Sequence, residues 1–213
     1  MAVAKEPTWL KRVRRLQTIA QAGISYSSDK YDVEGFKEIL EIAAEIAAEQ
    51  SNTSKQMFLT MFEEEVGYVT PKVDVRGAVF DDDKVLLVRE KSDADKWTLP
   101  GGWADTGFSP SENILKEAFE ETGLRVQATK LAAVCDRSRH AITPHQFYIY
   151  KLFFICEVLG GDLRPSLETS EARWFSEDKL PDEREMSDGR TRRYQVLRMF
   201  EHYRHSDLPT DFD

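Results

Sequence analysis

Apolar residues in the first third of the chain recur at the spacing of an amphipathic α-helix. They form one group between residues 9 and 20, a second between 33 and 47, and a third between 53 and 65. Apolar residues three or four positions apart share one face of a helix, so we predict three helices here. A unit of about 60 residues is only marginally stable alone, because it buries little surface. We therefore expect it to pack on the rest of the chain or on a second subunit.

The spacing changes after the segment VGYVTP at residues 66–71. VDVRGAVF, a DDDK turn and VLLVRE then predict a β-hairpin. Apolar positions predict further strands at about 124–135, 146–157 and 171–175, and a closing helix in RTRRYQVLRMFEHYRH. This order of strands and helices predicts an α/β fold with a mixed sheet. We expect a small all-helical domain at residues 1–66 and the α/β domain at residues 67–213.

A helix between residues 109 and 123 has clear signals at both ends. Ser109 and Glu112 predict a capping box with Pro110 at the first helical position. Gly123 suits the left-handed conformation that ends many helices. Between these ends, one arc of the helix is apolar and predicted to be buried, comprising Ile114, Leu115, Ala118 and Phe119. The neighbouring arc carries three carboxylates.

These carboxylates, Glu117, Glu120 and Glu121, repel one another. Two like charges 4 Å apart repel by about 4 kcal/mol at an effective dielectric constant of about 20, and the helix dipole disfavours negative charge at this end. A solvated acidic face is the usual explanation for such spacing. The glycine turn LPGGW just before the helix favours a different one. Mg²⁺ binds carboxylate and phosphate oxygens, so this segment predicts a metal site that handles phosphate.

Residues 102–124 resemble the Nudix box, G-x5-E-x7-R-E-U-x-E-E-x-G-U, in which U is a bulky apolar residue. The matching positions are Gly102, Glu117, Glu120, Glu121, Gly123 and Leu124. The resemblance implies an α/β/α sandwich with a mixed sheet. It also implies that the loop-helix-loop binds Mg²⁺ or Mn²⁺ and hydrolyses a diphosphate joined to a nucleoside and a variable group. Phe108 replaces a Glu of the motif, Lys116 replaces its Arg, and Ala118 is small for an apolar position.

The resemblance implies a role for each matching residue. The metal ligands would be the Gly102 carbonyl, Glu117, Glu120 and Glu121, with Glu117 as a ligand or a base. Lys116 would orient Glu117, although Lys lacks the planar geometry of Arg. Glu171 precedes a predicted strand and is a candidate base on a loop. A surface carboxylate explains Glu171 equally well.

The similarity extends beyond the box through PKVDVRGAVF, LLVREK, KWTLPGGWAD and RWF. Together with the helical segment, these resemble a bacterial Nudix subgroup that acts on CDP-choline or ADP-ribose, and Phe108 fits that subgroup. By analogy the helical domain would contribute to a homodimer or to the substrate pocket.

Four residues outside the box are candidates for contacts with the nucleotide substrate. Arg76 and Arg89 alternate with apolar residues and would face the phosphates, or else form exposed ion pairs. Arg137 and Tyr148 lie in CDRSRHAITPHQFYIYK, whose aromatic rings would cover a base, hold a quaternary ammonium group or belong to the sheet core.

Composition narrows the choice of partner and location. The formal charge of −9 over 213 residues argues against broad coating of nucleic acid or anionic membranes. No apolar run approaches the roughly 20 residues of a membrane span. The first residues lack the pattern of a signal peptide, so we expect the cytoplasm. KRVRR at 11–15 is basic, which leaves an RNA-end hydrolase or a non-catalytic nucleotide-sensing module as alternatives to a solvated helix face.

The two cysteines, Cys135 and Cys156, show no CxxC spacing. Their apolar surroundings favour buried free thiols over a zinc site or a disulfide.

Overall fold

The computed structural model describes residues 7–65, 67–143, 145–164 and 166–213. These residues divide into two units. One contains the described residues from 7 to 71 together with residues 145–148, and the other contains residues 72–143 and the described residues from 149 to 213. Residue 66, where the sequence places the domain boundary, and residues 1–6 lie outside the described residues.

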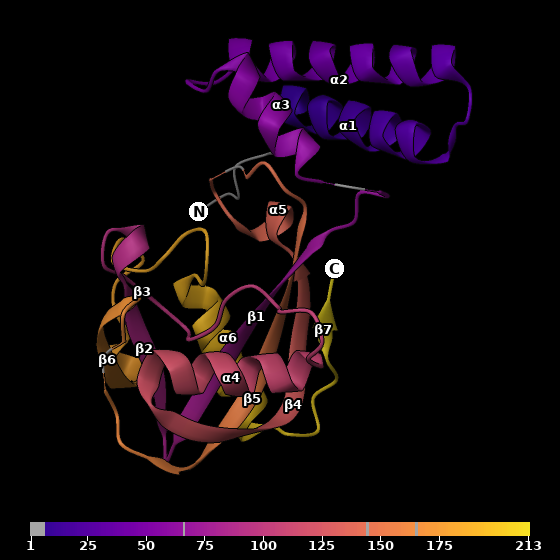
Figure 1. Ribbon diagram of the computed structural model, residues 1–213. Coiled ribbons are helices and arrows are strands. Elements are labelled where there is room, and N and C mark those ends of the chain that lie inside the picture. The colour runs from indigo at the N-terminus through magenta and orange to yellow at the C-terminus, as the bar shows by residue number, and fades with distance from the viewer. Residues whose placement is uncertain (1–6, 66, 144, 165) are drawn as a thin grey trace. The chain divides into compact units, whose positions relative to one another are not determined.

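The first unit contains the three predicted helices, α1 (Thr8–Tyr26), α2 (Lys30–Glu49) and α3 (Lys55–Glu63), which are labelled in Figure 1. Side chains of Asp29 and Ser54 cap α2 and α3 by accepting backbone N–H groups. The core of this unit is small and consists of Val13, Ala43, Ala44, Ala47, Phe58 and Phe62. All three of these alanines lie on α2, and their small side chains leave little apolar area to bury.

Residues 145–148 pack with these helices. Arg14 of α1 is buried and donates to the backbone carbonyl of Gln146 (3.1 Å). Its guanidinium lies 4.4 Å from the centre of the Tyr148 ring. Tyr148 therefore belongs to the helical unit, although the sequence pattern predicts a strand beginning at residue 146.

The second unit is built on a mixed sheet, as the sequence predicts. Its strands are β1 (Lys72–Asp81), β2 (Lys84–Glu90), β3 (Lys96–Thr98), β4 (Leu124–Asp136), β5 (Ile149–Gly161), β6 (Thr169–Ser176) and β7 (Asp211–Phe212). The order is β3-β2-β1-β5-β4-β7, and β6 also pairs with β2. β1 and β2 form the predicted antiparallel hairpin. β1 and β5 run parallel, with a register from Lys72 opposite Ile149 to Phe80 opposite Glu157.

Helices cover both faces of this sheet, α4 (Pro110–Thr122) on one and α6 (Arg193–Arg204) on the other (Figure 1). Val75 and Val79 of β1 pack in one core cluster with Ile114 of α4. The next residue along β1, Phe80, points to the opposite face of the sheet and packs against Phe200 of α6, with ring centres 5.1 Å apart. The predicted α/β/α sandwich is confirmed. The remaining helices are short: α5 (Arg137–His140) and the 3-10 turns Lys91–Asp93 and Glu177–Lys179.

The ends of α4 are as predicted. Ser109 accepts the backbone N–H of Glu112, and the Glu112 carboxylate accepts the backbone N–H of Ser109 (2.7 Å). Gly123 has φ of 79° and closes the helix through its N–H to the Phe119 carbonyl. The predicted buried arc is wrong in one respect: Phe119 is 44% exposed, whereas Glu121 is only 4% exposed. The prediction treats the helix by itself. Helical spacing contains no information about which loop covers each side of the helix.

The described helices include none with both the length and the apolar character that crossing a membrane requires.

Candidate active site

A glycine turn between β3 and α4 lies directly against β1. The Gly77 N–H donates to the Pro100 carbonyl and the Val75 N–H to the Gly102 carbonyl, both at 2.9 Å. Gly101 has φ of 136°, and a Cβ there would lie 2.0 Å from the Val75 carbonyl oxygen. Glycine is therefore required at position 101 for the turn to approach the strand so closely.

The turn meets two of the three helix carboxylates. The Gly101 N–H donates to Oε2 of Glu121 at 2.9 Å. A Cβ placed on Gly102 would lie 2.9 Å from Oε2 of Glu117. The Glu117 and Glu121 carboxylates thus lie beside the same glycine pair, and the second of them is buried.

Arg76 lies behind this turn as a buried cation. It forms two bonds to the Asp74 carboxylate, at 2.7 and 2.8 Å, and donates to the Leu99 carbonyl at 3.3 Å. The sequence left two roles open for Arg76, contact with phosphate or an exposed ion pair. The structure shows an ion pair, but a buried one that braces β1 and the turn.

The positive charge of Arg76 does not fully compensate the two carboxylates. Burial raises the pKa of Glu121 to about 8, despite the opposing effects of Arg76 and the Gly101 N–H. Burial likewise raises the pKa of Glu117 above its ordinary value. Two desolvated carboxylates beside the glycine turn offer oxygen donors suited to a hard divalent cation. The residues present therefore fit the metal that the sequence predicts.

Glu120 lies on the exposed side of α4 with Lys116. The Lys116 ammonium is 2.9 Å from the Glu120 carboxylate and 3.1 Å from Asp105, but 3.9 Å from Glu117. Its main partners are thus Glu120 and Asp105 rather than the expected Glu117. Within the described residues, oxygens of the three helix carboxylates do not gather within 4.8 Å of one another.

Comparison with known proteins decides the family. Residues 70–199, more than half of the chain, match the family model described as the NUDIX domain. The chain belongs to the Nudix family. It is a Nudix pyrophosphatase, as its sequence predicts. Residues 7–62 match a model described as UDP-X-like, N-terminal oligomerisation domain.

Relatives of this Nudix chain share both of its parts. A putative ADP-ribose pyrophosphatase YjhB of Bacillus subtilis is 40% identical over 205 residues, which cover 96% of this chain and 97% of the relative. A solved UDP-X diphosphatase is 28% identical, with 96% and 98% of the two chains covered and a TM-score of 0.61. An ADP-ribose pyrophosphatase of Streptococcus suis is 37% identical, covers 68% of this chain and 100% of its own, and has a TM-score of 0.60.

The other predicted site residues lie outside the Nudix turn. Arg89 and Glu171 face each other across β2 and β6 as an ion pair at 3.4 Å, and the Arg89 guanidinium lies 4.7 Å from the centre of the Trp97 ring. Glu171 is inside a strand rather than on the expected loop, and it also pairs with Arg173. Arg137 is buried and donates to the backbone carbonyls of Gly189 and Thr143, at 3.1 and 3.0 Å.

Two carboxylates of this Nudix site had no signal in the sequence pattern. The charge of Glu168, in the loop before β6, adds to the effects that raise the pKa of Glu117. The charge of Glu90, buried at the end of β2, does the same for the pKa of Glu121. Both come from strand ends outside the motif, so helical spacing could not reveal them.

Proposed function

We propose that this Nudix pyrophosphatase hydrolyses the diphosphate bridge of a nucleoside diphosphate linked to another group, with Mg²⁺ or Mn²⁺ as cofactor. ADP-ribose and CDP-choline are the first substrates to test. The observation that carries the proposal is the pair of desolvated carboxylates, Glu117 and Glu121, against the Gly101–Gly102 turn.

The relatives support this substrate class but do not identify the nucleobase of the substrate. ADP-ribose is named for the Bacillus subtilis and Streptococcus suis proteins, and a UDP-linked compound for the other structure. CDP-choline rests on the resemblance of the sequence to its subgroup. All of these substrates contain the diphosphate bridge that the site is suited to bind.

The roles of the residues follow from their positions. Glu117, Glu121 and the Gly102 carbonyl would hold the cation, and Glu120 would complete the acidic set. When bound, a divalent cation neutralises a diphosphate and lowers the pKa of coordinated water. Asp74 and Arg76 keep β1 and the glycine turn in place, and Arg76 does not need to touch the substrate for this purpose.

Glu168 is a better candidate for the base than Glu171. Glu168 is exposed and acts electrostatically on Glu117, whereas Glu171 is already paired with Arg89 and Arg173. The Glu171 carboxylate would have to leave both guanidinium groups before it could take up a proton from water. In this assignment Glu168 accepts the proton from the attacking water.

The test is a substrate panel assayed with Mg²⁺ and with Mn²⁺. It contains ADP-ribose, CDP-choline, sugar nucleotides, dinucleoside polyphosphates and short RNA. We expect metal-dependent release of two phosphate-bearing products from ADP-ribose or CDP-choline. Nucleotide binding without turnover of any compound would contradict the proposal and favour a non-catalytic sensor.

Preferential turnover of short RNA would instead support the RNA-end alternative. That alternative rests on a basic helix face, and this face has fewer exposed basic side chains than the sequence suggests. Arg14 is buried against residues 145–148, so the KRVRR segment presents only Lys11, Arg12 and Arg15 at the surface.

A further inference from the structure

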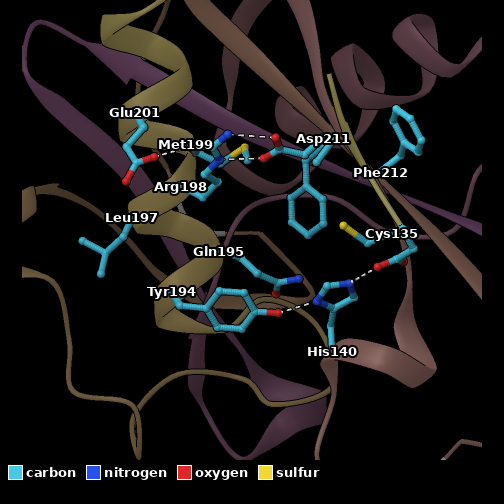
Figure 2. Close-up of a pocket in the computed structure, with 13 residues that line it drawn as sticks. Cys135, His140, Tyr194, Gln195, Leu197, Arg198, Met199, Glu201, Asp211 and Phe212 are labelled. Carbon is cyan, nitrogen blue, oxygen red and sulfur yellow. Dashed lines mark hydrogen bonds and ion pairs between the residues drawn. The ribbon is translucent and has the colours of Figure 1, made fainter. Parts of the chain in front are cut away.

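A second group of reactive side chains lies beside α6, on the face of the sheet opposite α4. Cys135 is near the end of β4, His140 ends α5, and Asp213 follows β7. The side chains of Cys135 and His140 lie close together in Figure 2. A thiol sulfur, an imidazole nitrogen and a carboxylate oxygen from these residues all lie within 4.8 Å of one another. Three different elements therefore bring three different donor types to one point.

The imidazole of His140 is held in a fixed orientation. Its Nε2 is 2.7 Å from Oδ1 of Asp213. Its Nδ1 is 2.7 Å from the Tyr194 hydroxyl (Figure 2). A hydrogen bond to the second ring nitrogen is the usual way in which proteins orient a metal-binding histidine. Tyr194 supplies that bond here.

The third member of the group is the Cys135 thiol. The described residues form no hydrogen bond with the Cys135 sulfur, although His140 and Asp213 lie beside it. Burial raises the pKa of Cys135 to about 11, with added effects from the Asp213 and Asp211 carboxylates. A cation bound at this point would instead lower the pKa of the thiol, because a coordinated thiol loses its proton.

The group forms part of the wall of a cavity of about 370 Å³. Much of the remaining wall is apolar and includes Phe153, Leu197, Met199 and Phe212. The acidic residue Asp211, also on the wall, is already paired with Arg198 (2.6 Å) and His202 (3.0 Å). Asp213 is thus the carboxylate that faces the histidine and the cysteine.

We propose that Cys135, His140 and Asp213 form a zinc site. Sulfur, imidazole nitrogen and carboxylate oxygen together suit a borderline-soft ion such as Zn²⁺, whereas Mg²⁺ prefers oxygen donors alone. Three protein donors leave the fourth position of a tetrahedral ion to water or to a small ligand in the cavity. The ion would also tie the two-residue strand β7 to β4 and α5, and it requires none of the Nudix carboxylates.

Cobalt substitution tests this proposal. The full chain is stripped with a chelator and titrated with Co²⁺, which gives a near-ultraviolet charge-transfer band only when a thiolate binds it. We expect the band in the wild-type protein, its displacement by one equivalent of Zn²⁺ per chain, and its loss in Cys135→Ser. Cys156→Ser is the matched control and should keep the band, because that thiol lies in the core on the α4 face. Co²⁺ bound at the Nudix carboxylates gives no such band.

A second variant keeps the proposal testable if Cys135→Ser fails to fold. Asp213→Asn keeps the thiol and should weaken Co²⁺ binding by about tenfold or more. The absence of a thiolate band in the wild-type protein would overturn the proposal. So would a band that Cys135→Ser retains, or an affinity that Asp213→Asn leaves unchanged.

Discussion

Glu121 is the residue at which function and stability conflict most directly. Its carboxylate is buried, accepts the Gly101 N–H and lies near the charge of Arg76, yet its pKa is raised to about 8 by burial. Ionised Glu121 therefore destabilises the folded protein until a cation arrives. Such a residue at the glycine turn is understandable as part of a metal site and not as part of a core.

Glu121→Gln should raise the melting temperature of the metal-free protein at alkaline pH. The pKa of Glu121 is higher in the folded than in the unfolded chain, so ionisation destabilises the fold progressively from about 4.5 upward, and fully above about 8. Gln removes this ionisation, while its amide oxygen can still accept the Gly101 N–H. Thermal unfolding in chelator should show a gain of several degrees above pH 8 and little gain below 4.5. Equal differences at both pH values would contradict this account.

Glu120→Gln should reduce turnover by about a hundredfold or more and leave the fold intact. The variant removes one anionic donor, and loss of even an outer partner of a metal commonly costs about 10- to 100-fold. Steady-state kinetics over a range of Mg²⁺ concentrations measures the effect, and circular dichroism checks the fold. Glu112→Gln is the matched control, because glutamine also serves in a capping box. An undiminished rate in Glu120→Gln would remove Glu120 from the site.

The motif itself could be located at the level of residues, because it lies on one helix and one turn. Neighbours from elsewhere in the chain could not. Three such features depend on contacts between elements: the ion pair of Lys116 with Asp105, the bracing role of Arg76, and the effect of the Glu168 charge on Glu117. Residue spacing within one segment contains no information about such contacts.

At the scale of elements, α4 depends on its ends. Ser109→Ala removes the side-chain acceptor of the Glu112 N–H and should lower the free energy of unfolding by about 1 kcal/mol. Urea titration measures this loss. Ser111→Ala is a suitable control, since the Ser111 hydroxyl bonds only to the Ser109 side chain among the interactions described. An equal loss in both variants would mean that the capping box adds nothing specific.

Elements with local signals were the ones that the sequence predicted well. The capping box, the terminal glycine and the acidic hairpin turn fixed the ends of α4 and of the β1–β2 hairpin. The start of β5 was misplaced because Phe147 and Tyr148 alternate like strand residues but pack with the helical unit. β3 and β7 were missed because strands of three and two residues are too short to show a period.

At the scale of the whole molecule, α2 carries apolar side chains that its own unit leaves partly uncovered. Ile39, Ile42 and Ile46 share one face of the helix, and Ile42 is 44% exposed. The matching family model is described as an oligomerisation domain. We propose that the chain forms a homodimer through its helical unit.

Analytical ultracentrifugation should therefore detect a dimer that Ile42→Asp shifts toward monomer, because the substitution places a charge in an apolar contact. Leu167→Asp is the matched control, since Leu167 lies in the other unit and is 96% exposed. A wild-type monomer at all concentrations would contradict the proposal, as would equal dissociation of both variants.

The proposed zinc group shows why the sequence could not predict every site. Neither cysteine forms a disulfide; Cys156 is buried as expected, whereas Cys135 is only half-buried. Cys135, His140 and Asp213 become neighbours only after β7 pairs with β4. Ligand spacing in the sequence identifies a metal site only when the ligands lie close together along the chain.

The parallel pairing of β1 with β5 also determines when the sheet can form. Residue 72 has left the ribosome long before residue 149, its partner, is translated. During that interval the newly made β1–β2 hairpin exposes an unpaired edge to other nascent chains. The yield of folded enzyme in cells therefore depends on protection of that edge during translation as well as on the stability of the finished sheet.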